Sequence, residues 1–299
     1  MINKQTKGSI LALVAALALA NSFIFSKSAL NTIHFVQFGL VWFSMGLVWL
    51  IAYILISGDL KEIRRLSQRG HLYTFLVGLF EALGTAFFYI ALKKVENPAI
   101  VSFLGNAGPV LVTLFGIILL KEVYSRMEIL GVILAISGIF TMSFQSGAVS
   151  DGIFMQGTEW IMLASLMFAT GTIIGRKQIQ RVSPSLLSLI RVVLLLIVFI
   201  VLFISLDLDL RLPAKAYRNM AIGSLLEALI TMVAAYSALK YIQAIRMSIL
   251  VNSKSIWVLI SAFVFFQLIP ETHQLIGGIL SLAGVVLLTI GKKRERESA

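Results

Sequence analysis

The sequence predicts an all-α integral membrane protein with ten transmembrane helices, arranged as two inverted five-helix repeats. Three observations support this: a very apolar composition, ten apolar runs long enough to cross a bilayer, and a duplication between the two halves. Of the 299 residues, 59% are hydrophobic and 13% are charged, and the mean hydropathy is +0.95. That composition is too apolar for a soluble globular protein and is typical of a polytopic membrane protein.

Ten segments each carry the roughly 20 mostly apolar residues that a helix needs to cross the hydrocarbon core. Stretches with dense charge or with proline separate them, such as residues 59–70 and the Ser183-Pro184 pair. We predict spans at residues 8–26, 33–57, 72–92, 98–120, 128–146, 158–176, 184–206, 219–239, 244–266 and 273–291.

The first apolar run also has features of a cleaved signal peptide. Lys4 and Lys7 precede it, and residues 18–20 (Ala-Leu-Ala) resemble a cleavage site. The run continues past that point through Phe25, and it matches a segment of the second half. We therefore expect it to remain as the first membrane helix.

The distribution of lysine and arginine predicts the orientation of the chain. With the N-terminus inside, the inner connections and termini hold 17 of the 25 Lys and Arg residues, and the outer connections hold six. Cytoplasmic loops carry the excess of these residues. We therefore predict a multi-pass protein of the cytoplasmic (inner) membrane with both termini in the cytoplasm. The net charge of +11 has the same cause and does not indicate a nucleic-acid partner.

The second half of the chain repeats the first. Residues 81–85 read Glu-Ala-Leu-Gly-Thr, and residues 227–231 read Glu-Ala-Leu-Ile-Thr, 146 positions later. Near the following tyrosines the correspondence shifts by one residue. Five spans per half is an odd number, so equivalent spans must cross the membrane in opposite directions. We place the two repeats at residues 1–149 and 150–299.

A carboxyl group in each half lies near the middle of an apolar span. Glu81 and Glu227 sit at equivalent depths, where a charged side chain costs roughly 2.5–3.5 kcal/mol on insertion scales. Thr85 and Thr231 follow one turn later on the same helical face, so each pair can present a carboxyl and a hydroxyl to one cavity. The alternative is that these groups only hydrogen-bond neighbouring helices together. We favour a binding site because the costly group occurs in both halves.

Two Ser-x-Leu-x-Asn segments end in a second duplicated pair, Asn106 and Asn252. Pro109 follows the first of them and should bend the fourth span near its middle. Such a bend is expected where transporters bind substrate. Interhelical hydrogen bonding is an equally good interpretation of both asparagines. The halves differ directly after this point, because Lys254 stands where the first half has Gly108.

Two cations lie within spans and lack a counterpart in the other half. Lys254 is central, so we expect it to face a cavity and either to pair with Glu81 or Glu227 or to receive an anionic group of the substrate. Arg191 lies nearer the inner end of its span, and snorkelling to the interface is its simpler interpretation.

Aromatic side chains complete the candidate site. Tyr89 and Tyr236 follow the two Glu–Thr pairs and can stack on a substrate, as can Trp42 and Trp257, although such residues more often pack or anchor helices. The predicted substrate-binding residues are Glu81, Thr85, Tyr89, Asn106, Glu227, Thr231, Tyr236, Asn252 and Lys254.

Small residues form a stripe in the fifth span and another in the tenth. Such stripes permit close helix contact, which can serve the scaffold of one chain or a homodimer. The residues are Gly131, Ala135 and Gly138, and Gly277, Ser281 and Gly284.

Several of these features together resemble the EamA-type transporters of the drug/metabolite transporter superfamily. They are the ten spans in two halves, the basic residues Lys27 and Arg176 closing the first span of each half, the Ser-x-Leu-x-Asn segments, Lys121-Glu122 after the fourth span, and the stretch Ser183 to Arg191. The first half departs from the family pattern, since its second span has no arginine. The resemblance implies that spans one, three, four, six, eight and nine line a cavity that spans five and ten brace.

The sequence therefore predicts a secondary transporter that moves a small organic solute by alternating access. No nucleotide-binding motif, metal-ligand cluster or Ser-His-Asp arrangement is present, and there is no cysteine, so we expect no enzyme activity and no cofactor. The family resemblance favours export of an amino acid, a metabolite or a drug-like compound. Proton coupling through either glutamate is a further hypothesis. The alternatives are a flippase for a lipid-linked sugar and a structural subunit that does not transport.

Overall fold

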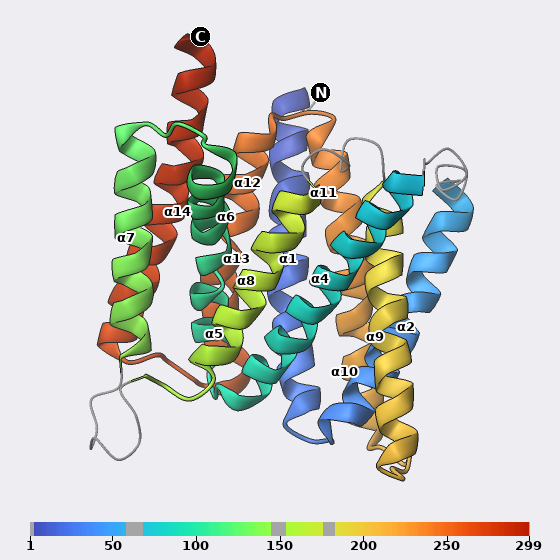
Figure 1. The fold of residues 1–299 in the computed structure, drawn as a ribbon. Coiled ribbons are helices and arrows are strands. Elements are labelled where there is room, and N and C mark those ends of the chain that lie inside the picture. Colours follow the sequence, from blue (N-terminus) through green and yellow to red (C-terminus); the bar gives the residue numbers. More distant parts are fainter. Residues whose placement is uncertain (1–2, 58–67, 145–153, 176–182, 299) are drawn as a thin grey trace.

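The computed structural model describes residues 3–57, 68–144, 154–175 and 183–298, and these residues form a bundle of helices (Figure 1). Ten of the helical spans in these ranges are long and apolar enough to cross a membrane, which confirms the ten predicted spans. Among the described residues, β-pairing is limited to an isolated antiparallel bridge between Phe144 and Phe154.

The spans of each half follow one another in the same order. The first half contains α1 (Lys4–Leu30), α2 (Phe35–Ser57), α4 (Gln68–Lys94), α5 (Pro98–Leu104), α6 (Ala107–Leu120) and α7 (Arg126–Ser143). The second contains α8 (Thr158–Gly175), α9 (Pro184–Ser205), α10 (Ala214–Leu225), the π-helix η2 (Leu226–Thr231), α11 (Met232–Leu239), α12 (Ala244–Asn252), α13 (Lys254–Phe266) and α14 (Thr272–Ser298).

The helices pack as an inverted repeat. α4 packs against α8 as α1 packs against α10 and α11, while α2 packs against α9 and α7 against α14. Exchanging each helix for its counterpart in the other half leaves this pattern unchanged. In Figure 1, α1 starts on the face that carries both termini and α8 starts on the opposite face, so the counterparts run in opposite directions. The predicted boundary at 149/150 lies outside the described residues.

The fourth span of each half is broken at the duplicated asparagine. In the first half, α5 ends before Gly105-Asn106 and α6 begins at Ala107. In the second half, α12 ends at Asn252 and α13 begins after Ser253. We predicted a bend only in the first half, from Pro109. The second break has no proline beside it, and there the Ser253 hydroxyl donates to the Leu250 carbonyl oxygen at 2.6 Å.

The two stripes of small residues face each other between α7 and α14. A Cβ added to Gly277 would lie 2.5 Å from the Gly138 carbonyl oxygen, and one added to Gly284 would lie 2.6 Å from that of Gly131. The two backbones therefore touch, which only small residues permit. Since this surface is used within one chain, a homodimer would have to form through other surfaces.

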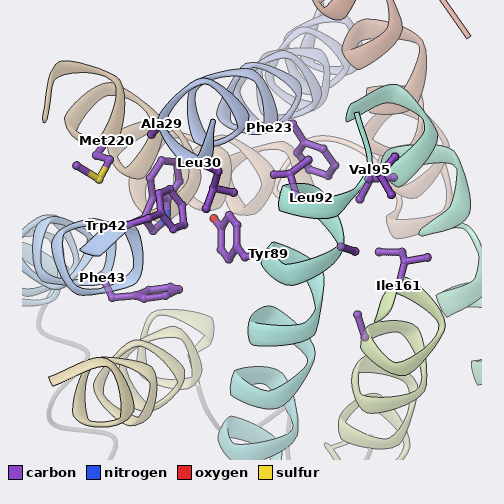
Figure 2. Close-up of a cluster of buried hydrophobic side chains, with 14 of the residues drawn as sticks. Phe23, Ala29, Leu30, Trp42, Phe43, Tyr89, Leu92, Val95, Ile161 and Met220 are labelled. Atoms are coloured by element: carbon purple, nitrogen blue, oxygen red, sulfur yellow. The ribbon is translucent and has the colours of Figure 1, made fainter. Parts of the chain in front are cut away.

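An apolar cluster fills the half of the bundle away from the termini (Figure 2). Leu30 comes from the last turn of α1, Leu92 from the last turn of α4, and Met220 from the middle of α10. The rings of Trp42 and Tyr89 lie 5.8 Å apart in the same cluster. The interior is therefore densely packed with apolar side chains at that end.

At the same end of the bundle, the Lys27 side chain joins α1 to the C-terminal end of α4 by hydrogen bonds. Its side chain is only 4% exposed. Its ammonium group donates to the carbonyl oxygens of Leu92 at 2.9 Å, Lys93 at 3.2 Å and Val95 at 2.7 Å. Carbonyls in the last turn of a helix lack partners within the helix, and a cation there also interacts favourably with the helix dipole.

We expect Lys27→Met to destabilise the protein by about 2–3 kcal/mol, because buried carbonyl oxygens that lose a donor keep their desolvation cost. The thermal unfolding midpoint in detergent measures this, and Lys215→Met, which changes an exposed lysine of α10, should leave it unchanged. An equal midpoint for Lys27→Met and wild type would show that the hydrogen bonds of Lys27 to the end of α4 (the Lys27 cap) contribute nothing to stability.

Candidate functional site

Glu227 lies at the centre of a group of polar side chains between the two halves. One carboxylate oxygen, Oε2, accepts hydrogen bonds from the indole Nε1 of Trp42 at 3.1 Å and from the hydroxyl of Tyr89. The other, Oε1, lies 3.9 Å from Nη2 of Arg191. Four spans thus meet at one carboxylate: α2, α4, α9 and η2. Figure 2 shows the Tyr89 hydroxyl turned from α4 toward the side of the cluster where Trp42 lies.

The guanidinium of Arg191 has unused hydrogen-bonding capacity. Its distance to Glu227 is an ion-pair distance but is too long for a hydrogen bond. Its Nε–H is buried and has no partner among the described residues. The Arg191 and Glu227 side chains are 20% and 18% exposed, so the pair is not sealed in a dry helix seam. A buried donor without a partner is uncommon and indicates room for a water or a ligand.

Arg191 therefore does not snorkel to the interface as we considered, and Arg191 rather than Lys254 is the ion-pair partner of Glu227. The inverted repeat relates Arg191 to another partner of this carboxylate, Trp42. Arg191 is the eighth residue of α9 and Trp42 is the eighth residue of α2, so the two side chains occupy equivalent positions. Trp42 stands where the family pattern would place a second arginine.

Close helix packing positions these groups. A Cβ on Gly78 of α4 would overlap the side chain of Ile190, so glycine lets α4 approach α9 next to Arg191. A Cβ on Gly223 would overlap the Trp42 ring. Gly223 precedes Glu227 by one turn, so the indole lies along α10 and its N–H reaches the carboxylate.

Glu227 is the second residue of the π-helix η2 (Leu226–Thr231). A π-turn closes hydrogen bonds between residues five apart and holds one residue more than an α-turn. The hydroxyl of Thr231 correspondingly donates to the Leu226 carbonyl oxygen, five residues earlier, at 2.8 Å. This extra residue accounts for the one-residue shift between the repeats, because α4 is a continuous α-helix around Glu81. π-turns within helices occur often at functional sites.

Glu81, the counterpart of Glu227, is half-buried on α4 and makes no side-chain hydrogen bond within the described residues. The charge of Arg191 acts on it as well. The hydroxyl of Thr85 donates to the Glu81 backbone carbonyl at 2.7 Å, and Thr231 also bonds to its own helix. Both hydroxyl protons are thus already used, so the two hydroxyls can serve a ligand only as acceptors.

The two asparagines have different surroundings. Asn106 is buried, and its amide donates to the Ser281 hydroxyl on α14 at 3.0 Å. The internal duplication places Ala135 where Ser281 stands, so Asn252 has no equivalent partner. Its amide makes only a 3.4 Å hydrogen bond to Ser248 in its own helix. Asn106 therefore joins helices, whereas the Asn252 amide is nearly free.

Lys254 and Tyr236 lie outside the Glu227 group. Lys254, the first residue of α13, is half-buried and has no hydrogen bond or ion pair within the described residues. The equivalent position in the first half, Gly108, has open space where a Cβ would be. Tyr236 is 38% exposed, in contrast to its counterpart Tyr89 at 3%.

The predicted residue set thus divides into groups. Glu227 and Tyr89 are in direct contact, and Glu81 lies within electrostatic reach of Arg191. Trp42 and Arg191 were outside the predicted set, although a cation inside a span is by itself a signal of a functional site. No group of three His, Asp or Glu side chains that could hold a metal ion occurs within the described residues.

Comparisons with known proteins agree with the architecture. The model of the EamA-like transporter family matches residues 6–144 and 155–290. The chain belongs to this family. It is a membrane transporter, and members of such families are not enzymes.

Two relatives of this EamA-like transporter carry transporter names as well. The "Uncharacterized transporter sll1164" of Synechocystis is 25% identical over 240 residues, covering 77% of this chain and 68% of that protein. The "Uncharacterized transporter YxxF" of Bacillus subtilis is 22% identical over 296 residues, covering 97% and 92%. The crystal structure of another protein superimposes on this chain with a TM-score of 0.63 and 15% sequence identity. The match covers 96% of this chain and 98% of the other, and it supports the fold.

Proposed function

We propose that this protein is a secondary transporter that moves a small organic solute by alternating access, with the Glu227–Arg191 pair at its binding site. The observation that carries the proposal is the buried, partnerless Nε–H of Arg191 beside a carboxylate held by both halves. The pair lies at the junction of α2, α4, α9 and η2. A rocking motion of one repeat against the other would change the access to this site.

The described packing is consistent with one state of the alternating-access cycle, in which the side away from the termini is closed. The apolar cluster and the Lys27 cap close the half of the bundle away from the termini. Breaks in the fourth spans of both repeats provide positions at which helices can bend. With both termini in the cytoplasm, as the basic residues predict, the closed side faces outward. The family resemblance favours export.

The charges of the site suggest which solutes to test first. Arg191 offers guanidinium N–H donors to a carboxylate, while Glu81 offers an unpaired carboxyl to an ammonium group. Zwitterions such as amino acids satisfy both. The nearly free amide of Asn252 and the partnerless Lys254 ammonium are further candidate contacts, with Thr85, Thr231 and Tyr236 less directly placed. Proton coupling would use Glu81 or Glu227.

A flippase for a lipid-linked sugar is the second candidate, favoured by one observation. An apolar crevice of about 480 Å³ lies between α6, α7 and α8, lined among others by Val110, Leu114 and Phe140. A lateral apolar opening suits a substrate with a lipid chain.

A ligand panel tests the proposal. We expect one class among amino acids, polyamines, nucleosides and lipid headgroups to raise the thermal unfolding midpoint of the purified protein, with zwitterions ranked first. That class should then show flux in proteoliposomes. Stabilisation by lipid headgroups alone would favour the flippase, and binding without flux would favour a structural subunit.

A further inference from the structure

A second, independent crevice opens on the face that carries the chain termini. It has a volume of about 780 Å³ and lies between the start of α1, the connection from α11 to α12, and α14. Its polar lining includes Lys4, Gln5 and Arg246, and its apolar lining includes Ile249, Leu250 and Ile290. None of the residues of the proposed transport site lines it.

The crevice is strongly basic. Lys4 and Arg246 line it directly, and Lys7 lies 4.9 Å above the ring of Tyr241, another lining residue. The side-chain amide of Gln5 lies next to the Arg246 guanidinium. None of these three cations forms an ion pair with an acidic side chain within the described residues. Three neighbouring cations without an acid repel one another, and an anion would relieve that repulsion.

The other repeat provides an internal comparison. A crevice at the equivalent place on the opposite face is lined by Glu96, Glu271, Lys94 and His273, among others. There Lys94 lies 4.0 Å from Glu159, and His273 lies 3.3 Å from Glu271, so acidic side chains accompany the basic ones. The excess of positive charge is therefore specific to one face and does not follow from the fold.

The depth of the crevice in the bundle indicates which anion fits. Lys4 and Arg246 stand at the first residues of two membrane-spanning segments, and Ile290 stands next to the last residue of another. The cations thus lie at headgroup depth, and the apolar lining continues toward the hydrocarbon core. A phosphate with acyl chains attached matches both parts, while a free phosphate matches only the first.

We propose that this crevice binds the phosphate of an anionic phospholipid, with its acyl chains against Ile249, Leu250 and Ile290. Lys4 and Arg246 contact the phosphate, and Lys7 adds to the positive potential. The lipid bridges α1, α12 and α14, and so connects the two repeats at the membrane surface. This binding does not depend on the identity of the transported solute.

The test is a titration of the purified full chain, in uncharged detergent, with dioctanoyl-phosphatidylglycerol, followed by native mass spectrometry. We expect one high-affinity lipid per chain. The double variant Lys4→Gln/Arg246→Gln should weaken its affinity by roughly thirtyfold, because each basic residue near the membrane surface contributes roughly a factor of five. Dioctanoyl-phosphatidylcholine should bind weakly to both proteins.

The matched control is Lys121→Gln/Arg126→Gln, which removes two exposed cations from the same face outside the crevice. It should keep wild-type affinity, as should Arg246→Lys, which retains the charge. Equal losses in the two double variants would overturn the proposal, because they would indicate a general charge effect. Competition by glycerol 3-phosphate as strong as that of the lipid would overturn it as well, since the acyl chains would then contribute nothing. Unchanged affinity in Lys4→Gln/Arg246→Gln would do the same.

Discussion

Replacing Glu227 with Gln should lower the flux of the transported solute by about a hundredfold, the largest functional effect that we expect from one substitution. The side chain keeps its size, but its hydrogen bonds cannot be kept. Oε2 faces two donors, Trp42 and Tyr89, and Oε1 faces Arg191. In either orientation, the amide NH₂ of Gln would oppose a donor or the guanidinium. Truncating one partner of a buried charge pair typically costs about 2–5 kcal/mol.

Flux is measured in proteoliposomes with the solute class found by the ligand panel. Glu271→Gln serves as the control, because it makes the same change at a side chain that is 72% exposed. Wild-type flux in Glu227→Gln would remove the carboxylate from the mechanism. The double variant Glu227→Gln/Arg191→Gln should be more stable than either single variant, since it leaves no uncompensated charge. If the double variant is the least stable, the two residues act independently.

The ten spans could be predicted because a membrane helix is defined by composition over about 20 residues, and composition is read directly from a sequence. The inverted repeat could be predicted because five is an odd number and the Glu81 and Glu227 segments match. Neither inference needs knowledge of which side chains touch. The break at Ser253 could not be predicted, since no proline or glycine marks that position in the sequence.

The candidate site was predicted only in part, because its partners lie far apart in the sequence. Glu227 was found from its duplication and its cost in an apolar span. Its partners Tyr89 and Trp42 are 138 and 185 positions away. Both residues have counterparts, Tyr236 and Arg191, but only one member of the tyrosine pair reaches a carboxylate. Duplication indicates which positions are equivalent, and it does not indicate where the two copies have diverged.

The different roles of the two duplicated asparagines could not be predicted from the sequence either. Asn106 and Asn252 end identical motifs, and the sequence alone treats them alike. Their difference arises on another helix, where Ser281 offers a hydroxyl to Asn106 and Ala135 offers nothing to Asn252. The role of a polar group in a membrane bundle is thus decided by its partner, and that partner is identified only by the packing of α14 against α5.

Gly138→Ala should destabilise the protein by about 3 kcal/mol or more, although it adds a single methyl group. The new Cβ would lie 2.5 Å from the Gly277 carbonyl oxygen and would also overlap the Ser281 backbone nitrogen. Both obstacles are backbone atoms, which cannot rotate away, so α7 and α14 would have to separate. Association of membrane helices depends on close van der Waals packing, and separation weakens it along the whole contact.

The chain offers a matched control for this prediction. Gly108 is also a helical glycine, at the start of α6, and a Cβ added there meets no atom within 4 Å. Gly108→Ala should therefore leave the thermal unfolding midpoint unchanged or raise it slightly, because alanine is favoured over glycine in helices by up to about 1 kcal/mol. A midpoint for Gly138→Ala as high as that for Gly108→Ala would mean that α7 and α14 do not touch at their glycines. The bracing role of these helices would then need another basis.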